Sequence, residues 1–266
     1  MVELKGLSLA YPLPRKRLAT ALGHIDARFE KDRFSLIIGP SGCGKTSLIK
    51  IMAGLLKPGT GKVLIRGEEA QEAGVKRAVI FQDFGLLPWK TVQANAELPL
   101  RIAHAKEPER KRAALLLEKF GLLPFAKRYP HQLSGGMKQR LAIVRALAAQ
   151  PEILLMDEPF SSLDALTRED AQDFLLSVKE EQALTVIMVT HSIEEAVYLA
   201  DSVYVMTGKN PGTIQTCITV SRNGLSRALF REGREFREYC ALLRNTLKKT
   251  PEPPPGFQGK RQQEEA

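Results

Sequence analysis

Residues 39–46 combine glycines with a lysine and a threonine in an order that suits phosphate binding. The stretch reads GPSGCGKT and fits the P-loop pattern G-x-x-x-x-G-K-[S/T]. Its glycines let the backbone curl so that N–H groups point at phosphate oxygens, and the following helix directs its partial positive end there. We expect Lys45 to meet the β- and γ-phosphates and the Thr46 hydroxyl to complete Mg²⁺ coordination. The residues predicted to bind the nucleotide here are Gly39, Pro40, Ser41, Gly42, Cys43, Gly44, Lys45, Thr46 and Ser47.

Two adjacent carboxylates follow an apolar run much later in the chain. Residues 153–158 read ILLMDE, so Asp157 and Glu158 come directly after an expected buried strand. A parallel α/β sheet has its ligand crevice at the carboxyl ends of its strands, which places both acids near the phosphates. Asp157 would hold Mg²⁺ through the hydrogen-bonded shell around it, and Glu158 would polarise the attacking water as a general base. A solvated turn is the alternative, and the P-loop disfavours it.

The elements that must position these residues are visible in the apolar pattern. Short apolar runs at 34–38, 153–156 and 185–189 indicate buried strands, and helical spacing follows the P-loop up to Gly54. Further strands are expected at 2–11, 23–29, 61–66 and 77–82, with a basic loop containing Pro12 and Pro14 between the first two. Helices are expected at 165–182, at 231–248 and throughout about 91–150. The pattern predicts an α/β core sheet interrupted by a helical insert.

The P-loop and the acidic pair alone indicate a P-loop NTPase, a class that also includes GTPases, helicases and small-molecule kinases. Residues 133–140, LSGGMKQR, distinguish among these. They resemble the LSGGQ signature of the ABC ATPase family, with Met137 in place of the commoner glutamine. Gln82 lies 37 residues after Lys45, where the family's Q-loop glutamine falls, and His191 lies 34 residues after Asp157, where its switch histidine falls. The segment 161–164, SSLD, follows Glu158 as the D-loop does. The resemblance covers residues 1 to about 215.

The resemblance implies a fold and a set of roles. The fold is an ABC ATPase core of P-loop NTPase type, with an N-terminal antiparallel β subdomain and a helical insert at about 88–150 of a 1–249 domain. His191 would hold the γ-phosphate and water in line with the base, and Gln82 would sense Mg²⁺ and water, serving both catalysis and the metal. Tyr11 would stack on adenine, although packing alone is the alternative. The residues implied to meet the nucleotide or interface of a second protomer are Ser134, Gly135, Gly136 and Asp164.

Composition limits the other classes of function. The chain has 266 residues and a net charge of +9, which suits nucleic acid, anionic lipid, an anionic ligand or a solvated basic face. Its three cysteines and four histidines are too scattered for a disulfide framework or metal cluster, and no apolar run reaches membrane-span length. The N-terminus lacks the pattern of a secretion signal. The Pro- and charge-rich composition of residues 250–266 predicts a disordered tail of unknown role.

Transport is the favoured use of this ATPase. ABC proteins of DNA repair carry coiled coils or zinc modules, and those of translation join two ATPase copies; the sequence shows neither pattern. The implied partners are a second copy bound through ATP, permease subunits in the membrane and, indirectly, a solute-binding protein, with no nucleic acid. A heterodimer stays possible. The implied location is peripheral, at the cytoplasmic face of the inner membrane.

The segment LLPW at residues 86–89 points to one transporter subgroup. Leu86, Leu87 and Trp89 are apolar in an expected exposed loop, which predicts a docking surface, with a loop packed on its own helices as the alternative. LLPW and the turn PGTI at 211–214 resemble the ATPases of importers for nitrate, sulfonates and taurine. An amino-acid or metal importer, or an exporter motor, remains the alternative. The transported solute and the permease cannot be identified from this chain.

Overall fold

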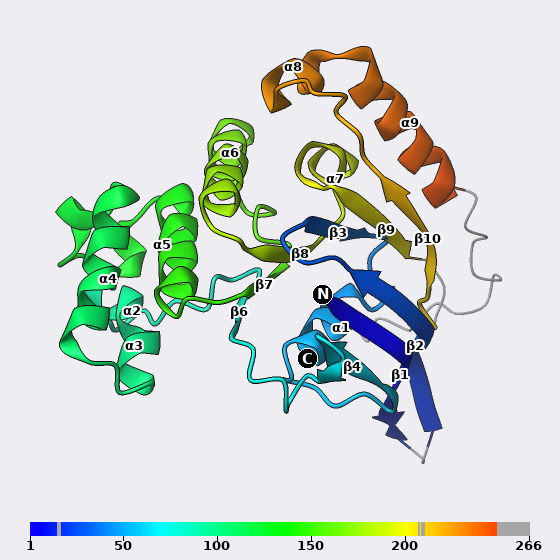
Figure 1. The fold of residues 1–266 in the computed structure, drawn as a ribbon, viewed down its shortest axis with the longest axis horizontal. Coiled ribbons are helices and arrows are strands. Elements are labelled where there is room, and N and C mark those ends of the chain that lie inside the picture. Colours follow the sequence, from blue (N-terminus) through cyan, green and yellow to red (C-terminus); the bar gives the residue numbers. More distant parts are fainter. Residues whose placement is uncertain (15–16, 207, 209–210, 249–266) are drawn as a thin grey trace, which may run out of the picture.

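A largely parallel sheet forms the centre of the computed structural model, which describes residues 1–14, 17–206, 208 and 211–248 (Figure 1). Its strand order is β10-β9-β3-β8-β7-β6, and β10 runs antiparallel to β9. The pairs β9–β3, β3–β8, β8–β7 and β7–β6 are parallel. The bounds are β3 Phe34–Ile38, β6 Arg77–Ile80, β7 Ile153–Asp157, β8 Thr185–Thr190, β9 Ser202–Met206 and β10 Ile214–Thr219.

The central strands are mainly apolar because both faces of the sheet are covered. Every residue of β3, β7 and β8 is buried. Leu36 and Leu154 belong to a hydrophobic cluster shared with helices α5 (Gly135–Ala148) and α6 (Ala165–Glu181). Their neighbours Ile37 and Leu155 belong to a second cluster, with helix α1 (Lys45–Met52) and the N-terminal strands. Successive side chains point to opposite faces, so both faces of these strands are mainly apolar, and their few buried polar residues include Asp157 and Thr190 at the strand ends.

A second, antiparallel sheet lies beside the core, in the order β2-β1-β4-β5. Its bounds are β1 Val2–Leu13, β2 Arg17–Phe29, β4 Thr60–Ile65 and β5 Glu68–Glu69. The first two strands are longer than predicted, since Pro12 pairs with Leu18 in the hairpin rather than lying in a loop. Pairing of β1 with β4 ends at Ser8, so Pro12 lies where β1 needs no N–H donor towards that neighbour. The predicted N-terminal antiparallel subdomain is confirmed.

Helices α2–α5 form a separate lobe, at the left of Figure 1. The bounds are α2 Val92–Ala96, α3 Leu98–Ile102, α4 Glu107–Lys119 and α5 Gly135–Ala148. The helical structure predicted over about 91–150 was not divided between α2 and α3. The break falls at Glu97, and Pro99 lies in the first turn of α3, where its missing N–H needs no acceptor. This lobe is the predicted inserted helical subdomain.

The C-terminal segment returns to the core and covers α7 (Ile193–Leu199). The single helix expected at 231–248 is two, α8 (Arg227–Glu232) and α9 (Arg234–Lys248), separated by Gly233. Arg222 donates to the carbonyls of Ala200 and Tyr198, and Arg227 to that of Tyr198 at 2.8 Å. These cations satisfy carbonyls at the end of α7. Part of the positive charge of the arginine-rich segment 222–248 therefore serves the fold.

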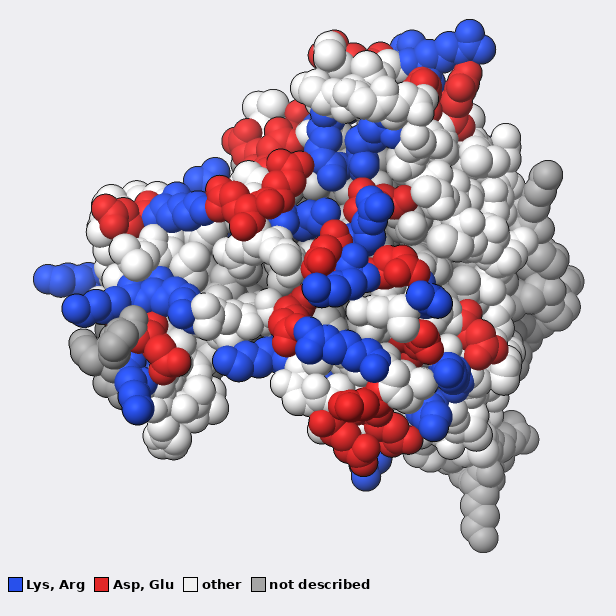
Figure 2. Space-filling model, viewed as in Figure 1, with Lys and Arg blue, Asp and Glu red and all other residues white. Residues whose placement is uncertain are grey.

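The remaining charge is spread over the surface. Figure 2 shows Lys and Arg side chains interleaved with Asp and Glu on the face that it draws. Several form ion pairs, such as Arg231 with Glu169 at 2.9 Å and Lys119 with Glu181. Among the described helices, none has the length and apolar character needed to cross a bilayer. The predicted disordered tail, 250–266, lies outside the described residues.

Gly212 joins the C-terminal part of the core to the P-loop. Its N–H donates to Ala21 O at 3.0 Å, and its carbonyl accepts from Gly23 N at 2.9 Å. A Cβ at this position would lie 1.9 Å from the carbonyl oxygen of Cys43, so no side chain fits without moving backbone. The turn predicted at 211–214 therefore packs directly behind the phosphate-binding loop.

We expect Gly212→Ala to destabilise the folded chain by about 1–3 kcal/mol, because the new methyl group overlaps backbone that cannot rotate away. Urea denaturation followed by circular dichroism would measure the change. Gly59→Ala is the matched control, since its nearest atom, Ser8 O, is 3.4 Å from the added Cβ. Equal unfolding midpoints for the two variants would contradict the close contact.

Candidate functional site

The P-loop lies between β3 and α1 and is shaped by two glycines in the left-handed region. Gly42 has φ 80° and Gly44 has φ 95°, values that residues with a side chain rarely adopt. Gly44 is also the N-cap of α1, and no side chain caps the helix. Lys45 is 6% exposed, and its Nζ donates to the carbonyls of Gly39 at 2.8 Å and Pro40 at 3.0 Å. Its cation is thus held within the loop.

Thr46 and Asp157 meet at the predicted metal position. Thr46 Oγ1 donates to Asp157 Oδ1 at 3.1 Å, which joins the start of α1 to the end of β7. Burial raises the pKa of Asp157, whereas this hydrogen bond and the nearby Lys50 and Lys45 lower it. A hydroxyl and one carboxylate, beside phosphate oxygens and water, make the oxygen-only donor set that Mg²⁺ prefers. The residues present therefore fit the ion.

An open cleft of about 510 Å³ lies over the P-loop. Predicted residues supply most of its lining: Tyr11, Ser41, Gly42, Gly44, Lys45, Thr46, Ser47, Gln82 and Glu158. Three further lining residues, Ala19, Thr20 and Ala21, were missed. They come from β2 and reach the cleft because Tyr11 pairs with Ala19 in the hairpin. The two predicted strands carried this signal, but their register did not follow from the sequence.

Tyr11 stands at the edge of this cleft. It is 40% exposed, and its hydroxyl shares a hydrogen bond of 2.9 Å with Ser47 Oγ, on α1. The hydrogen bond fixes the phenol end of the ring against the P-loop helix, while the exposed part remains open to a planar partner. The arrangement suits the predicted stacking on a base.

Glu158 and His191 form a pair where β7 and β8 end. His191 Nδ1 and Glu158 Oε2 lie 2.9 Å apart in a hydrogen bond. Glu158 has φ +47°, a strained value for a residue of this kind, and its backbone N–H donates to Val189 O at 3.0 Å. Such strain persists only when surrounding contacts enforce it. The turn directs this carboxylate into the cleft, where it can accept a proton from water.

The signature residues and Asp164 lie on the helical side and do not line the cleft. Ser134 caps α5 by accepting from Met137 N at 3.3 Å, and Asp164 caps α6 by accepting from Thr167 N at 3.1 Å. A Cβ on Gly136 would lie 2.5 Å from Thr167 Cγ2, so the two helix starts pack closely. Within one chain, the structure does not bring these residues to the P-loop.

The LLPW segment is partly buried and partly exposed. Trp89 is 71% exposed, whereas Leu86 packs against the core cluster and Leu87 is half-buried. The predicted docking surface is therefore centred on Trp89 rather than on all three side chains. Asn95, fully buried at the start of the lobe, fixes the loop through hydrogen bonds to Leu87, Lys90 and Thr91. Sequence reasoning gave Asn95 no role.

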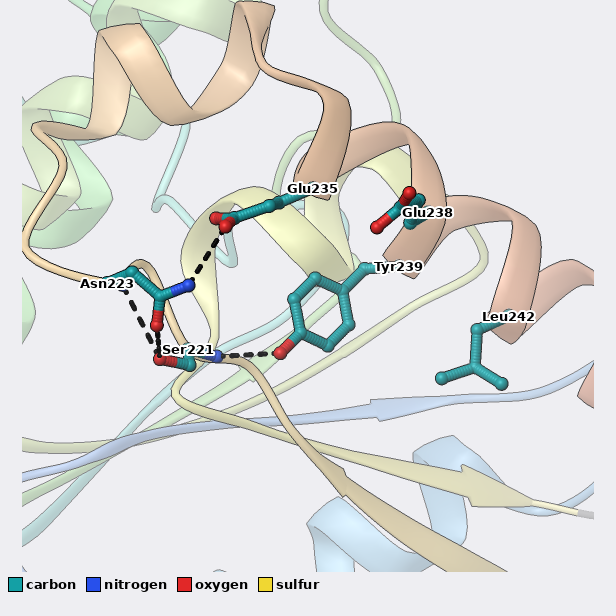
Figure 3. A pocket seen from close by; sticks show the side chains of 6 residues that line it. All are labelled: Ser221, Asn223, Glu235, Glu238, Tyr239 and Leu242. Atoms are coloured by element: carbon teal, nitrogen blue, oxygen red, sulfur yellow. Dashed lines mark hydrogen bonds between the residues drawn. The ribbon is translucent and has the colours of Figure 1, made fainter.

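A second cavity, of about 280 Å³, lies between α9 and the segment after β10 (Figure 3). Its lining consists of Ser221, Asn223, Glu235, Glu238, Tyr239 and Leu242. The polar groups largely bond to one another: Asn223 donates to Glu235 at 2.9 Å, and Ser221 N donates to the Tyr239 hydroxyl at 3.1 Å (Figure 3). It shares no lining residue with the cleft over the P-loop.

The family and the relatives found by comparison with known proteins agree with an ATP-binding site at the P-loop. The family model described as ABC transporter matches residues 22–161. An uncharacterized ABC transporter ATP-binding protein of Methanocaldococcus jannaschii is 44% identical over 229 residues, which are 86% of this chain and 84% of that protein. The aliphatic sulfonates import ATP-binding protein of Bacillus licheniformis is 45% identical over 202 residues (76% and 78%). The nitrate import ATP-binding protein of a Synechocystis species is 40% identical over 205 residues (77% of each).

The fold comparison agrees. A solved dimeric ATP-binding cassette, in a post-hydrolysis state with ADP and Pi, superposes with a TM-score of 0.72 and 32% identity. The match covers 83% of this chain and 99% of that one. Sequence, fold and the arrangement around the P-loop thus lead to one conclusion: this chain belongs to the ABC transporter family, as one of its ATP-binding, ATP-hydrolysing cassettes.

Proposed function

We propose that this chain is the motor subunit of an importer for a small oxyanion or organic solute of the nitrate, sulfonate or taurine kind. The observation that carries the ATPase mechanism is the hydrogen bond between Glu158 and His191 at the edge of the P-loop cleft. The relatives named for nitrate, aliphatic sulfonate and taurine import, at 40–45% identity, support the solute class.

Each residue around the cleft then has a chemical task. Lys45 and the P-loop N–H groups bind the β- and γ-phosphates. Thr46 and Asp157, with Gln82 nearby, would hold Mg²⁺, which neutralises charge that develops on the phosphate oxygens. Glu158 polarises the attacking water as the general base. His191 orients that carboxylate through its hydrogen bond and contacts the γ-phosphate.

The second half of each site comes from another copy of the chain. Ser134, Gly135 and Gly136 begin α5, where backbone N–H groups can meet a γ-phosphate, yet they lie outside the cleft of their own chain. A homodimer closed through two ATP molecules satisfies both facts. Asp164 then crosses between the protomers. The solved relative in a dimeric, post-hydrolysis state supports this assembly.

Force reaches the membrane through the helical lobe. Gln82 lines the cleft and lies seven positions before Trp89, which is exposed on the loop held by Asn95. We take residues 88–150, within an ATPase domain of 1–249, to move as one insert when Gln82 responds to the γ-phosphate. Trp89 would dock on a permease, placing the chain peripherally on the cytoplasmic face of the inner membrane. A solute-binding protein would deliver the solute, and nucleic acid has no part in this cycle.

Replacement of Tyr11 tests the adenine contact. Stacking of a base on an aromatic ring contributes about 1–3 kcal/mol, so Tyr11→Ala should weaken ATP binding by roughly 5- to 150-fold. Tyr11→Phe keeps the ring and loses the hydroxyl bonded to Ser47, so its affinity should stay near that of the wild type. Titration with a fluorescent ATP analogue would measure both. Equal, unchanged affinities would show that Tyr11 is only a packing residue.

Glu158→Gln tests the chemical step. The amide cannot accept the proton from water, so the rate of hydrolysis should fall about 10²- to 10⁴-fold. ATP binding should persist, and the variant should accumulate as an ATP-bound dimer detectable by size-exclusion chromatography. Lys45→Ala is the contrasting variant, because loss of its cation should remove nucleotide binding. Wild-type turnover by Glu158→Gln would exclude this carboxylate as the base.

Trp89→Ala tests the coupling surface in proteoliposomes containing the membrane subunits that co-purify with the wild-type chain. Loss of a central aromatic contact costs about 2 kcal/mol or more, so permease affinity should fall about 30-fold and uptake with it. Leu229→Ala, which removes an apolar side chain that is 61% exposed on α8, is the control. The wild-type vesicles should take up nitrate, an alkanesulfonate or taurine. Uptake of an amino acid or metal ion instead would assign the chain to another importer class.

A further inference from the structure

The carboxylate of Glu195 is buried behind the loop that carries His191. Glu195 belongs to α7 and is 6% exposed. Thr190 Oγ1 donates to its Oε2 at 2.6 Å, and the same Thr190 oxygen accepts from Ser192 N at 3.1 Å. The Glu195 backbone N–H donates to Ser192 Oγ at 3.2 Å. Both neighbours of His191 in the chain are therefore tied to Glu195.

Arg168 connects Glu195 to the segment that follows Glu158. Its Nε lies 3.8 Å from the carboxylate of Glu195. The same guanidinium donates to the backbone carbonyls of Phe160, at 3.3 Å, and Leu163, at 2.6 Å. Arg168 lies one helical turn after Asp164, and the backbone N–H of Arg168 donates to the backbone carbonyl of Asp164 at 2.9 Å. The Arg168 side chain thus holds the segment that leads to Asp164, and its backbone N–H holds Asp164 itself.

Together with one further bond, these contacts form a closed ring that includes Glu158 and His191. Ser161 Oγ donates to the carbonyl of Glu158 at 2.9 Å, which joins the loop to the base. The ring then passes through Arg168, Glu195 and Thr190 to His191, which returns to Glu158. The paired residues of β7 and β8 end at Asp157 and Val189, and one further backbone bond joins Glu158 N to Val189 O. Beyond that point, strand pairing no longer fixes the distance between the two functional side chains.

The burial of this charge argues against a role in stability alone. Desolvation raises the pKa of Glu195, and the hydrogen bond from Thr190 and the charges of Arg168 and His191 only offset that effect in part. Glu158 also faces it and raises the pKa further. Buried ion pairs rarely stabilise a fold more than apolar side chains of the same size would. A geometric requirement explains the pair better.

We propose that Arg168 and Glu195 are positioning residues for ATP hydrolysis, holding the Asp164 loop and the His191 loop in one arrangement so that Glu158 and His191 stay aligned. The proposal rests on the proposed function. It implies that a shift of Asp164 at the contact with a second protomer changes the placement of His191 through the guanidinium. Neither residue touches the nucleotide cleft, so the pair acts through the catalytic residues.

The test is steady-state ATPase kinetics of the full chain. Glu195→Gln keeps the side-chain volume and an acceptor for Thr190 but loses the charge that faces Arg168. Because misplaced catalytic groups lower the rate by up to about 100-fold, kcat should fall roughly 10- to 100-fold. KM for ATP should change by less than about twofold, since substrate contacts are intact. Arg168→Met should act alike, and Arg168→Lys should recover part of kcat.

The double variant distinguishes positioning from separate effects. If the two residues act as one unit, Glu195→Gln with Arg168→Met should lose no more kcat than the worse single variant. Glu169→Gln, which breaks the surface pair with Arg231 on the same helix, is the matched control and should keep wild-type kinetics. Should Arg168→Met not fold, Arg168→Lys combined with Glu195→Gln takes its place.

The outcomes separate this proposal from the one on which it rests. Wild-type kcat in Glu195→Gln, or losses that multiply in the double variant, would overturn the positioning role, as would a rise in KM that accounts for the whole effect. Such results leave the proposed function standing if Glu158→Gln is inactive. Hydrolysis by Glu158→Gln at the wild-type rate would overturn the proposed function first.

Discussion

Parallel pairing of β3, β8 and β7 is the constraint on which the site depends. The three strands start and end at similar levels, so the chain leaves each of them at the same edge of the sheet. The P-loop follows β3, the acidic pair closes β7, and His191 follows β8. The ladder therefore brings the P-loop, Asp157, Glu158 and His191 to one place, where the proposed phosphate, metal and water chemistry needs them. A shift of one residue in either ladder would also exchange the side chains that face the two hydrophobic clusters.

Contacts that close this edge from outside are less regular than the ladder. On one side, Gly212 lies against Cys43 and ties the P-loop to the C-terminal part of the core. On the other, Arg168 bridges the loops that carry Asp164 and His191. Both contacts join backbone segments distant in sequence. They limit how far the loops can move independently. The helical lobe is joined to the segment after β6 differently, by the side chain of Arg145, which donates to the backbone carbonyls of Phe84 and Gly85.

Much of the fold and most of the cleft could be predicted because their signals are local. The mainly apolar runs at 34–38 and 153–156 have few interpretations besides buried strands, and the spacing of the glycines, Lys45 and Thr46 marks the P-loop that lines the cleft. The breaks at Glu97 and Gly233 were missed although Pro99 and Gly233 are local signals of a helix boundary, because the apolar spacing on either side was given more weight. The positions of Asn95 and Glu195 could not be predicted either. Each is a buried polar residue whose partners are set only when distant backbone comes close.

The separation of the signature residues 134–136 from the cleft has a consequence for how the cell uses ATP. A chain without a partner has the P-loop that binds ATP, but it lacks the contacts that the start of α5 in a second copy would make to the nucleotide. If hydrolysis requires the proposed dimer, a subunit that remains alone can therefore keep its nucleotide intact. ATP consumption would then rise with the concentration of the chain, because two copies must meet before either site is complete.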